Sequence, residues 1–482
     1  MAETLKEKTA RGLMWGGLNS GTTQLFNLVF GICLGRLLSP ADYGLVGVLS
    51  IFSLIAGNLQ SSGFSTAVVN MKRPQHRDYN AVFWFNVLTS AALYILLFLS
   101  APLIADFFHR EELTSLSRVV FLSFFISSFG ISVNAYMTKN MMQREMAIVS
   151  AAALTVSGVT SVAMALAGMT YWSIAAQQVV NSAMLVAGRF CFVRWRPTLS
   201  FDFSPIRQTF GFSMKILVTM VVTTVSNNIL TVIFGNLLGM RTTGNFFQAN
   251  KWNTLAHALI STTVMQVAQP VLVEIRSDRA RERRVFRKMM RFTAFLSFPA
   301  LLGLSLVSRE FLLTTIGSKW LDAAPLLQIL CIGGAFMPFY TLYQNLVISH
   351  GRSDINMWLN IAQIVLQIGV IVIISHMGVT LMVAAYTALN IAWLATWQAA
   401  AHRLTGLRLA DVARDLLPFL LAAAGVMAVC HFATLWIETA PLLLLARIAL
   451  AAALYTATLR MAHAQILDEC LQFVRDKRRR RA

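Results

Sequence analysis

Long apolar runs follow one another along almost the whole sequence. About fourteen of them are long enough to cross the roughly 30 Å hydrocarbon core of a bilayer as helices. The expected spans are residues 13–38, 43–69, 80–106, 115–137, 146–168, 171–193, 209–237, 243–270, 289–308, 322–349, 355–376, 378–401, 415–436 and 441–463. Lipid admits only helices and closed barrels, and these runs are about twice the length of barrel strands. The sequence therefore predicts an all-α integral membrane protein with about 14 transmembrane helices.

The composition excludes a soluble enzyme of this size. Of the 482 residues, 56% are hydrophobic and 13% are charged, whereas a soluble domain has about 25% charged residues. Phosphate-loop, zinc-protease and nucleophile-elbow motifs do not occur in the sequence. The sequence thus indicates no catalytic residues, no metal site and no cofactor.

The basic residues, 40 Lys and Arg against 21 Asp and Glu, gather in alternate loops. The largest groups lie at Arg276–Arg291 and Lys477–Arg481, on the side predicted for the N-terminus. This bias predicts a multi-pass protein with both termini in the cytoplasm. Anionic lipid headgroups explain the clusters, so we expect the membrane, and no nucleic acid, as their partner.

Two polar joints and an internal repeat divide the chain. The joints are residues 194–208 and 402–415. At an offset of 200, six pairs are identical: Thr23/Thr223, Asn27/Asn227, Gly35/Gly235, Leu37/Leu237, Leu38/Leu238 and Gly44/Gly244. A parallel repeat is a common design of secondary transporters. We expect an N-terminal six-helix bundle in residues 1–200 and a C-terminal six-helix bundle in 201–405. Residues 406–482 would form an extra helix pair and a basic tail.

Cations inside the predicted spans indicate an anionic partner. Lys215 and Lys251 each lie about two turns inside a span, whereas the acidic residues fall in loops, tails or helix ends. An intramembrane charge is costly and is a functional candidate by default. Arg189 and Arg447 lie nearer to span ends, where we expect their side chains to reach the headgroups.

Polar stripes mark the same faces of equivalent helices. Asn19, Thr23 and Asn27 recur every fourth residue, and the repeat places Thr219, Thr223 and Asn227 on the matching face of the span 209–237. In the next span, Gln248 shares a face with Lys251. Such stripes either pack helices together or line a polar cavity between the two halves, and the sequence leaves both interpretations open. The candidate substrate-binding residues are Lys251, Lys215, Gln248, Asn227, Asn228, Asn19, Thr23 and Asn27.

Three motifs carry a resemblance to a known family. They are GRLLSPADYGLVGV at Gly35–Val48, GFSTAVV at Gly63–Val69 and GSKWLDAAPLLQIL at Gly317–Leu330. In order and spacing they resemble the polysaccharide-transporter branch of the MOP flippase superfamily, the Wzx-type exporters. The resemblance implies two six-helix bundles in a V and an alternating-access cycle. Relatives often carry an Asp where this chain has Leu230, so no role of that carboxylate carries over.

The resemblance also implies a substrate. This would be undecaprenyl pyrophosphate carrying an oligosaccharide, moved from the inner to the outer leaflet of the bacterial cytoplasmic membrane for O-antigen, capsule or exopolysaccharide. A polysaccharide polymerase and glycosyltransferases are the candidate protein partners, and the coupling ion, Na⁺ or H⁺, stays open. The alternatives are a lipid II-type flippase or a multidrug antiporter of the same superfamily. From a different class, a membrane glycan polymerase would need a longer outer loop.

The loop charges generate a topology prediction. Reporter fusions after Ala482 and within Arg276–Arg291 should report the cytoplasm, because both regions are strongly basic. A fusion near Lys319 should report the outside. Paired enzymatic reporters, each active on one side of the membrane, measure this. An external signal after Ala482 would contradict the even number of spans.

Overall fold

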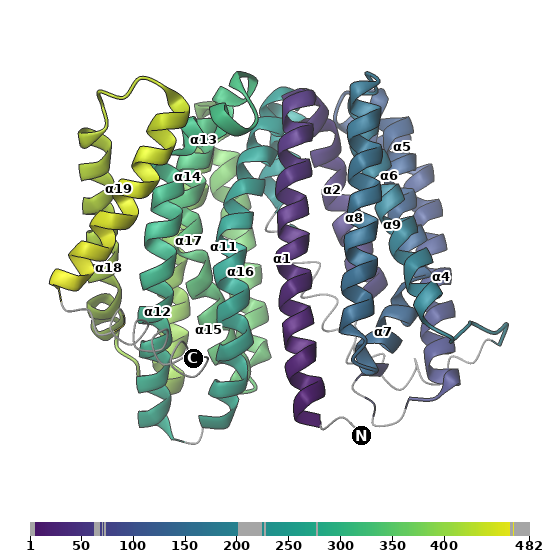
Figure 1. Cartoon of the computed structure of the whole chain (residues 1–482), viewed down its shortest axis with the longest axis horizontal. Helices are drawn as coiled ribbons and strands as arrows, with labels where there is room; N and C mark the ends of the chain where they lie inside the picture. Colours follow the sequence, from purple (N-terminus) through teal and green to yellow (C-terminus); the bar gives the residue numbers. More distant parts are fainter. Residues whose placement is uncertain are drawn as a thin grey trace, which may run out of the picture. The chain divides into compact units, whose positions relative to one another are not determined.

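The computed structural model describes residues 5–61, 68–69, 71, 74–200, 224–225, 228–275, 278–462 and 466. Over these residues the chain forms helices joined by short turns, without a strand (Figure 1). By its internal contacts the chain divides into two compact units, Met1–Gly244 and Asn245–Ala482. The predicted bundle boundaries at residues 200 and 405 stay predictions.

The first unit contains the helices up to the start of α11. They are α1 (Leu5–Leu37), α2 (Pro40–Ser61), α4 (His76–Leu99), α5 (Ala101–Phe107), α6 (Glu112–Ser128), α7 (Ile131–Lys139), α8 (Gln143–Leu166), α9 (Trp172–Phe192) and the short helix Asn228–Leu237. Helix α8 packs against α1 and α9, and α6 packs against α4 and α9.

The second unit begins within α11. Its helices are α11 (Met240–Ile275), α12 (Arg279–Leu306), α13 (Ser308–Thr315), η1 (Ser318–Ala323), α14 (Ala324–Gly334), α15 (Met337–Ser349), α16 (Ser353–Ile374), η2 (Ser375–Met377), α17 (Val379–Thr405), α18 (Leu409–Ala433) and α19 (Ala440–Met461). Helix α12 packs against α14 and α18, and α19 packs against α13 and α18. Figure 1 shows α18 and α19 as a neighbouring pair in green and yellow.

Within the described residues, nine helices are long and apolar enough to cross a membrane, or ten if the bent pair α6–α7 counts as one span. Every expected span except 43–69 and 209–237 coincides with one helix or with consecutive helices over its described residues. Residues 62–67 of the span 43–69 and most of the span 209–237 lie outside the described residues. The all-α membrane fold is therefore confirmed, and the number of about fourteen spans stays a prediction.

Local chemistry sets the ends of the helices. Helix α12 begins ten residues before its expected span, because the side chain of Asp278 caps the N–H groups of Ala280 and Arg281 at 3.0 Å. Helix α17 ends at Gly406, whose φ of 73° suits a residue without a side chain. Arg279, Arg281, Arg283, Arg284 and Arg287, which were expected in a loop, thus lie on the first turns of α12.

Two glycines that are equivalent in the repeat make a reciprocal contact inside the first unit. A Cβ on Gly44 would lie 2.0 Å from the carbonyl oxygen of Met240, and a Cβ on Gly244 would lie 1.6 Å from that of Pro40. Met240 and Pro40 are the first residues of α11 and α2, and they too are separated by the offset of 200. Because neither position has room for a side chain, the first turns of α2 and α11 approach backbone to backbone.

Candidate functional site

One face of α11 carries buried polar groups that have no hydrogen-bond partner. Asn245, Gln248 and Trp252 follow at intervals of three and four residues and are 3%, 0% and 4% exposed. Both amide atoms of Gln248, Oδ1 of Asn245 and the indole Nε1 of Trp252 have no hydrogen-bond partner. A buried group left this way costs about 1–3 kcal/mol. Groups that persist at this cost are candidates for binding a ligand or water.

Lys251 lies beside this face. Its Nζ is 5.9 Å from the ring centroid of Trp252, a cation–π distance. The indole is itself held edge-on against Phe311 of α13, with 5.1 Å between the centroids. Lys251 is half-buried and lies eleven residues after the first residue of α11, about 16 Å along the helix axis. The ammonium group is therefore in contact with an aromatic ring that is itself fixed by packing.

Asn253 is a further residue of α11 with an unpaired polar atom, and it faces α14. Its Oδ1 has no hydrogen-bond partner, and a Cβ on Gly334 of α14 would lie 2.0 Å from this oxygen. Sequence reasoning missed Asn245 and Asn253, although two asparagines eight residues apart in a predicted span were a visible signal. Without Asn253, which lies on the opposite side of the helix from Lys251, these residues of α11 offer a cation, amide donors and acceptors, and an indole N–H. That combination suits a ligand with an anionic group and hydroxyls.

The other predicted site residues are more dispersed. Asn19 and Thr23 of α1 are half-buried, and Asn27 is exposed. Asn228 donates from Nδ2 to the carbonyl of Thr224 in its own helix, at 2.9 Å. Lys215 and Asn227 lie outside the described residues. Of the predicted set, Gln248 and Lys251 lie three residues apart on α11, and Asn19, Thr23 and Asn27 lie four residues apart on α1.

The structure corrects the expectation for Arg447. Its side chain does not reach for the headgroups but is 7% exposed, and its Nη1 lies 3.1 Å from Oε2 of Glu310, which is equally buried. Its Nε also donates to Oγ1 of Thr434 at 3.1 Å, and Nη1 donates to the carbonyl of Leu306 at 3.2 Å. The hydrogen bonds satisfy several N–H donors of the guanidinium, and the carboxylate of Glu310 balances its charge. Together these contacts offset the cost of burying the charged group.

Arg447 stands between two cavities of the second unit. An apolar one of about 720 Å³ lies along α12, α13 and α19, and a more polar one of about 640 Å³ lies at the ends of α13 and α18. Arg447 and Leu306 line both. The ion pair therefore forms the boundary between an apolar space and a polar one.

Two further polar clusters of the second unit were not predicted from the sequence. Arg287 of α12 binds both oxygens of the buried Asp415 of α18, at 2.6 and 3.1 Å. Oδ1 of Asn390 accepts hydrogen bonds from Gln363 and Gln367, each at 2.8 Å. These groups have hydrogen-bond partners, in contrast to those of α11. We therefore interpret them as contacts that stabilise the packing of neighbouring helices. In the described part of the chain no group of three His, Cys, Asp or Glu could hold a metal ion.

The Glu310–Arg447 pair generates a stability prediction. Arg447→Met should lower the free energy of unfolding by about 3–5 kcal/mol, because Glu310 would stay buried without its cation. Glu310→Gln should also destabilise the protein, and the double change Glu310→Leu with Arg447→Met should recover most of the loss. Unfolding temperatures of the purified variants, combined as a double-mutant cycle, measure this. Unchanged stability of Arg447→Met alone would support the original headgroup interpretation.

Comparison with known proteins identifies the family. Residues 33–325 match the model of the family described as polysaccharide biosynthesis protein. The lipopolysaccharide biosynthesis protein WzxC of Escherichia coli K12 is 25% identical over 388 residues, 78% of each chain. The teichuronic acid biosynthesis protein TuaB of Bacillus subtilis 168 is 24% identical over 73% of each chain. The succinoglycan biosynthesis transport protein ExoT of Rhizobium meliloti 1021 is 22% identical over 100% of this chain and 99% of its own.

Solved structures agree on the fold. The lipid II flippase MurJ in an inward closed conformation superposes with a TM-score of 0.72 at 14% identity, over 94% of this chain and all of the other. An inward-facing multidrug resistance MATE transporter of the MOP superfamily has a TM-score of 0.63 at 16% identity, over 80% and 95% of the two chains. The chain therefore belongs to the polysaccharide biosynthesis protein family, and it has the fold of the MurJ and MATE proteins.

Proposed function

We propose that this protein moves an undecaprenyl-pyrophosphate-linked oligosaccharide from the inner to the outer leaflet of the bacterial cytoplasmic membrane by alternating access. The product would serve a cell-surface polysaccharide such as an O-antigen, a capsule or an exopolysaccharide. In this proposal the protein changes no covalent bond, and both of its termini are cytoplasmic. A polymerase and glycosyltransferases are its proposed protein partners.

The observation that carries the proposal is the polar face of α11. Lys251 supplies a positive charge deep in a helix, next to the fully buried and unpaired amide of Gln248. A pyrophosphate carries the opposite charge and accepts hydrogen bonds from ammonium, amide and indole N–H groups. Sugar hydroxyls both donate and accept, as the amides of Asn245 and Gln248 can. This chemical complementarity is our reason for proposing an anionic glycoconjugate as the ligand.

Electrostatics explains why the protein would need such a cation. Moving an unpaired ionised phosphate into hydrocarbon costs tens of kcal/mol on Born estimates. A cation inside a membrane-spanning segment reduces this penalty by pairing with the phosphate charge. Lys251 is the cation that we propose for this pairing. The Trp252 ring would stabilise the ammonium group in the interval without substrate.

The named relatives act in the synthesis of different polymers: lipopolysaccharide, teichuronic acid and succinoglycan. A transporter fold that serves several glycans has to recognise something other than the sugar sequence. The pyrophosphate of a lipid carrier is such a feature, and Lys251 is our candidate for binding it. The oligosaccharide would then be held by adaptable amide groups.

Substitution of Lys251 tests the proposal. Lys251→Ala should abolish export of the surface glycan at unchanged protein level, because the pyrophosphate would lose its cation. Lys251→Arg should retain part of the activity, since it keeps the charge with a different shape, and Lys251→Glu should be the most impaired. Surface polysaccharide and inner-leaflet lipid-linked glycan, measured in a deletion strain carrying each variant, report the outcome.

Lys319→Ala serves as the control, because it removes one lysine charge from the short segment η1 and should leave export unchanged. Normal export by Lys251→Met would refute the role of Lys251. The identity of the accumulating lipid separates the alternatives, because a lipid II-type flippase would accumulate the peptidoglycan precursor instead.

Gln248 gives a prediction in which stability and function change in opposite directions. Gln248→Leu should raise or preserve the unfolding temperature, because it removes two buried polar atoms that have no partner. The same change should reduce export several-fold if the amide binds substrate. Thermal unfolding and glycan export of the one variant measure both effects. A Gln248→Leu protein that is less stable and exports normally would show that the amide serves helix packing.

A further inference from the structure

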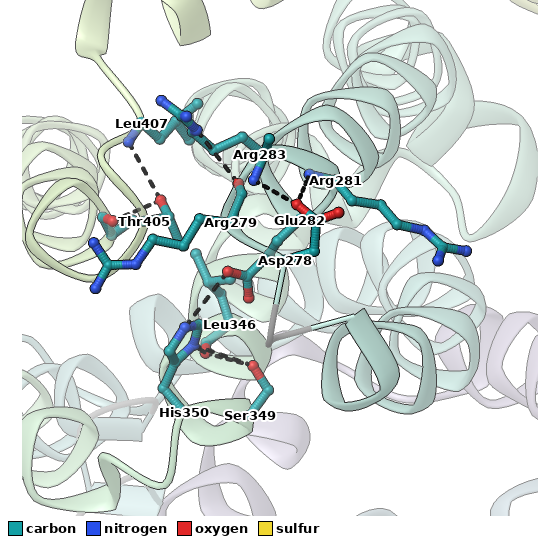
Figure 2. Close-up of polar contacts among 12 residues, drawn as sticks. Asp278, Arg279, Arg281, Glu282, Arg283, Leu346, Ser349, His350, Thr405 and Leu407 are labelled. Atoms are coloured by element: carbon teal, nitrogen blue, oxygen red, sulfur yellow. Dashed lines mark hydrogen bonds and ion pairs between the residues drawn. The ribbon is translucent and has the colours of Figure 1, made fainter.

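A buried acid and a histidine meet where α12 begins. Glu282, in the first turns of α12, has a side chain with 0% exposure, and its Oε2 lies 3.5 Å from Nε2 of His350, the residue that follows α15 (Figure 2). Neither carboxylate oxygen has a hydrogen-bond partner. Among the described residues, His350 is the one cationic partner within ion-pair distance of Glu282. The proposed substrate site on α11 does not use this pair.

The hydrogen bonds of His350 fix where its proton lies. Its Nδ1 is 3.0 Å from the carbonyl oxygen of Leu346, which can only accept, so Nδ1 carries a hydrogen. In a neutral imidazole the other nitrogen, Nε2, then has a lone pair and no hydrogen. That lone pair would face the oxygen of Glu282. If Glu282 were ionised at the same time, two acceptors would oppose each other in a buried place.

One additional proton removes this conflict. Placed on Nε2, it makes an imidazolium that pairs with the carboxylate; placed on Glu282, it makes a neutral acid that faces a lone pair. Either form is compatible with a carboxylate that has no water contact and no other donor. Without the proton, a buried charge would stay without a hydrogen bond, which is strongly unfavourable.

The surrounding charged groups do not supply Glu282 with the partner that this proton would provide. Arg279 attracts Glu282 through space but forms no ion pair with it among the described contacts, and Figure 2 shows Arg281 extending away from His350. Arg283 donates to the carbonyl of Arg279 and lies 3.7 Å from where a Cβ of Gly406 would be, at the end of α17. Other charged and titratable groups on packed elements have partners of their own: Arg352 with Asp354 at the start of α16, His402 with Leu407 at the end of α17, and Asp411 and Asp415 of α18 with Arg287.

We infer that Glu282 and His350 form a proton-binding site that holds the start of α12 to the end of α15. With the proton bound, the two helices are joined; when the proton leaves, the contact opens. The site lies among the basic residues that the sequence places at the cytoplasmic side. A change in proton activity there would therefore alter the packing of helix ends that face the cytoplasm.

Protein stability as a function of pH tests the site without any substrate. The joined form is present at low pH and is lost as the pH rises through the release of the proton. The unfolding temperature of the full-length protein in lipid nanodiscs should therefore fall, by about 2–4 °C, between about pH 6 and pH 9. Glu282→Gln should remove this part of the pH dependence, because a carboxamide can donate to Nε2 at every pH.

Asp278→Asn is the matched control. Asp278 is an exposed carboxylate four residues before Glu282, and the backbone N–H of Arg281 holds its pKa below the ordinary value. It stays ionised over this range, so its replacement should shift stability equally at every pH. His350→Gln is the second variant and should also flatten the profile if Glu282→Gln does not fold.

The proposal is overturned if Glu282→Gln and His350→Gln both keep the wild-type pH profile, or if Asp278→Asn flattens it equally. These measurements use purified protein without lipid-linked glycan. They therefore stand whether or not the Lys251 variants support the proposed function, and the two ideas can fail separately.

Discussion

In the low-dielectric interior of a membrane protein, each polar group must find its partner within the chain. The backbone meets this requirement by forming helices, which is why the described residues contain little else. Charged side chains meet it by pairing. Arg447 with Glu310, and Arg287 with Asp415, connect α19 and α18 to α13 and α12. The last two helices are thus held against α12 and α13 of the same unit by two separate ion pairs.

The exceptions to this requirement are as informative as the pairs. Gln248, Asn245 and Trp252 are buried on α11 with polar atoms that have no partner, whereas Gln363, Gln367 and Asn390 satisfy one another on neighbouring helices. The same residue types therefore occur in two different states. An unsatisfied set beside Lys251 is what a binding site without its ligand would present, because functional sites are the places where local rules are broken.

The repeat has a direct structural expression. Gly44 and Gly244 each lie against the backbone at the start of the other's helix, so that equivalent positions of α2 and α11 face each other. The likeness to MurJ at 14% identity shows that this arrangement of helices is compatible with very different sequences. Packing of small residues sustains the fold, and the substrate must be argued from side chains such as Lys251.

The sequence by itself determined the architecture, because apolar runs of about 20 residues have no other way to cross hydrocarbon. It also singled out Lys251 and Gln248, since a cation or an amide in such a run is conspicuous. It did not reveal the partners. Arg287 and Asp415 are 128 residues apart, and the depth of Arg447 in its span suggested the headgroups rather than Glu310. Hydropathy gives the depth of a residue along one helix. Which helix ends meet, and so which charges are joined and which amides are left unsatisfied, is decided by tertiary packing alone.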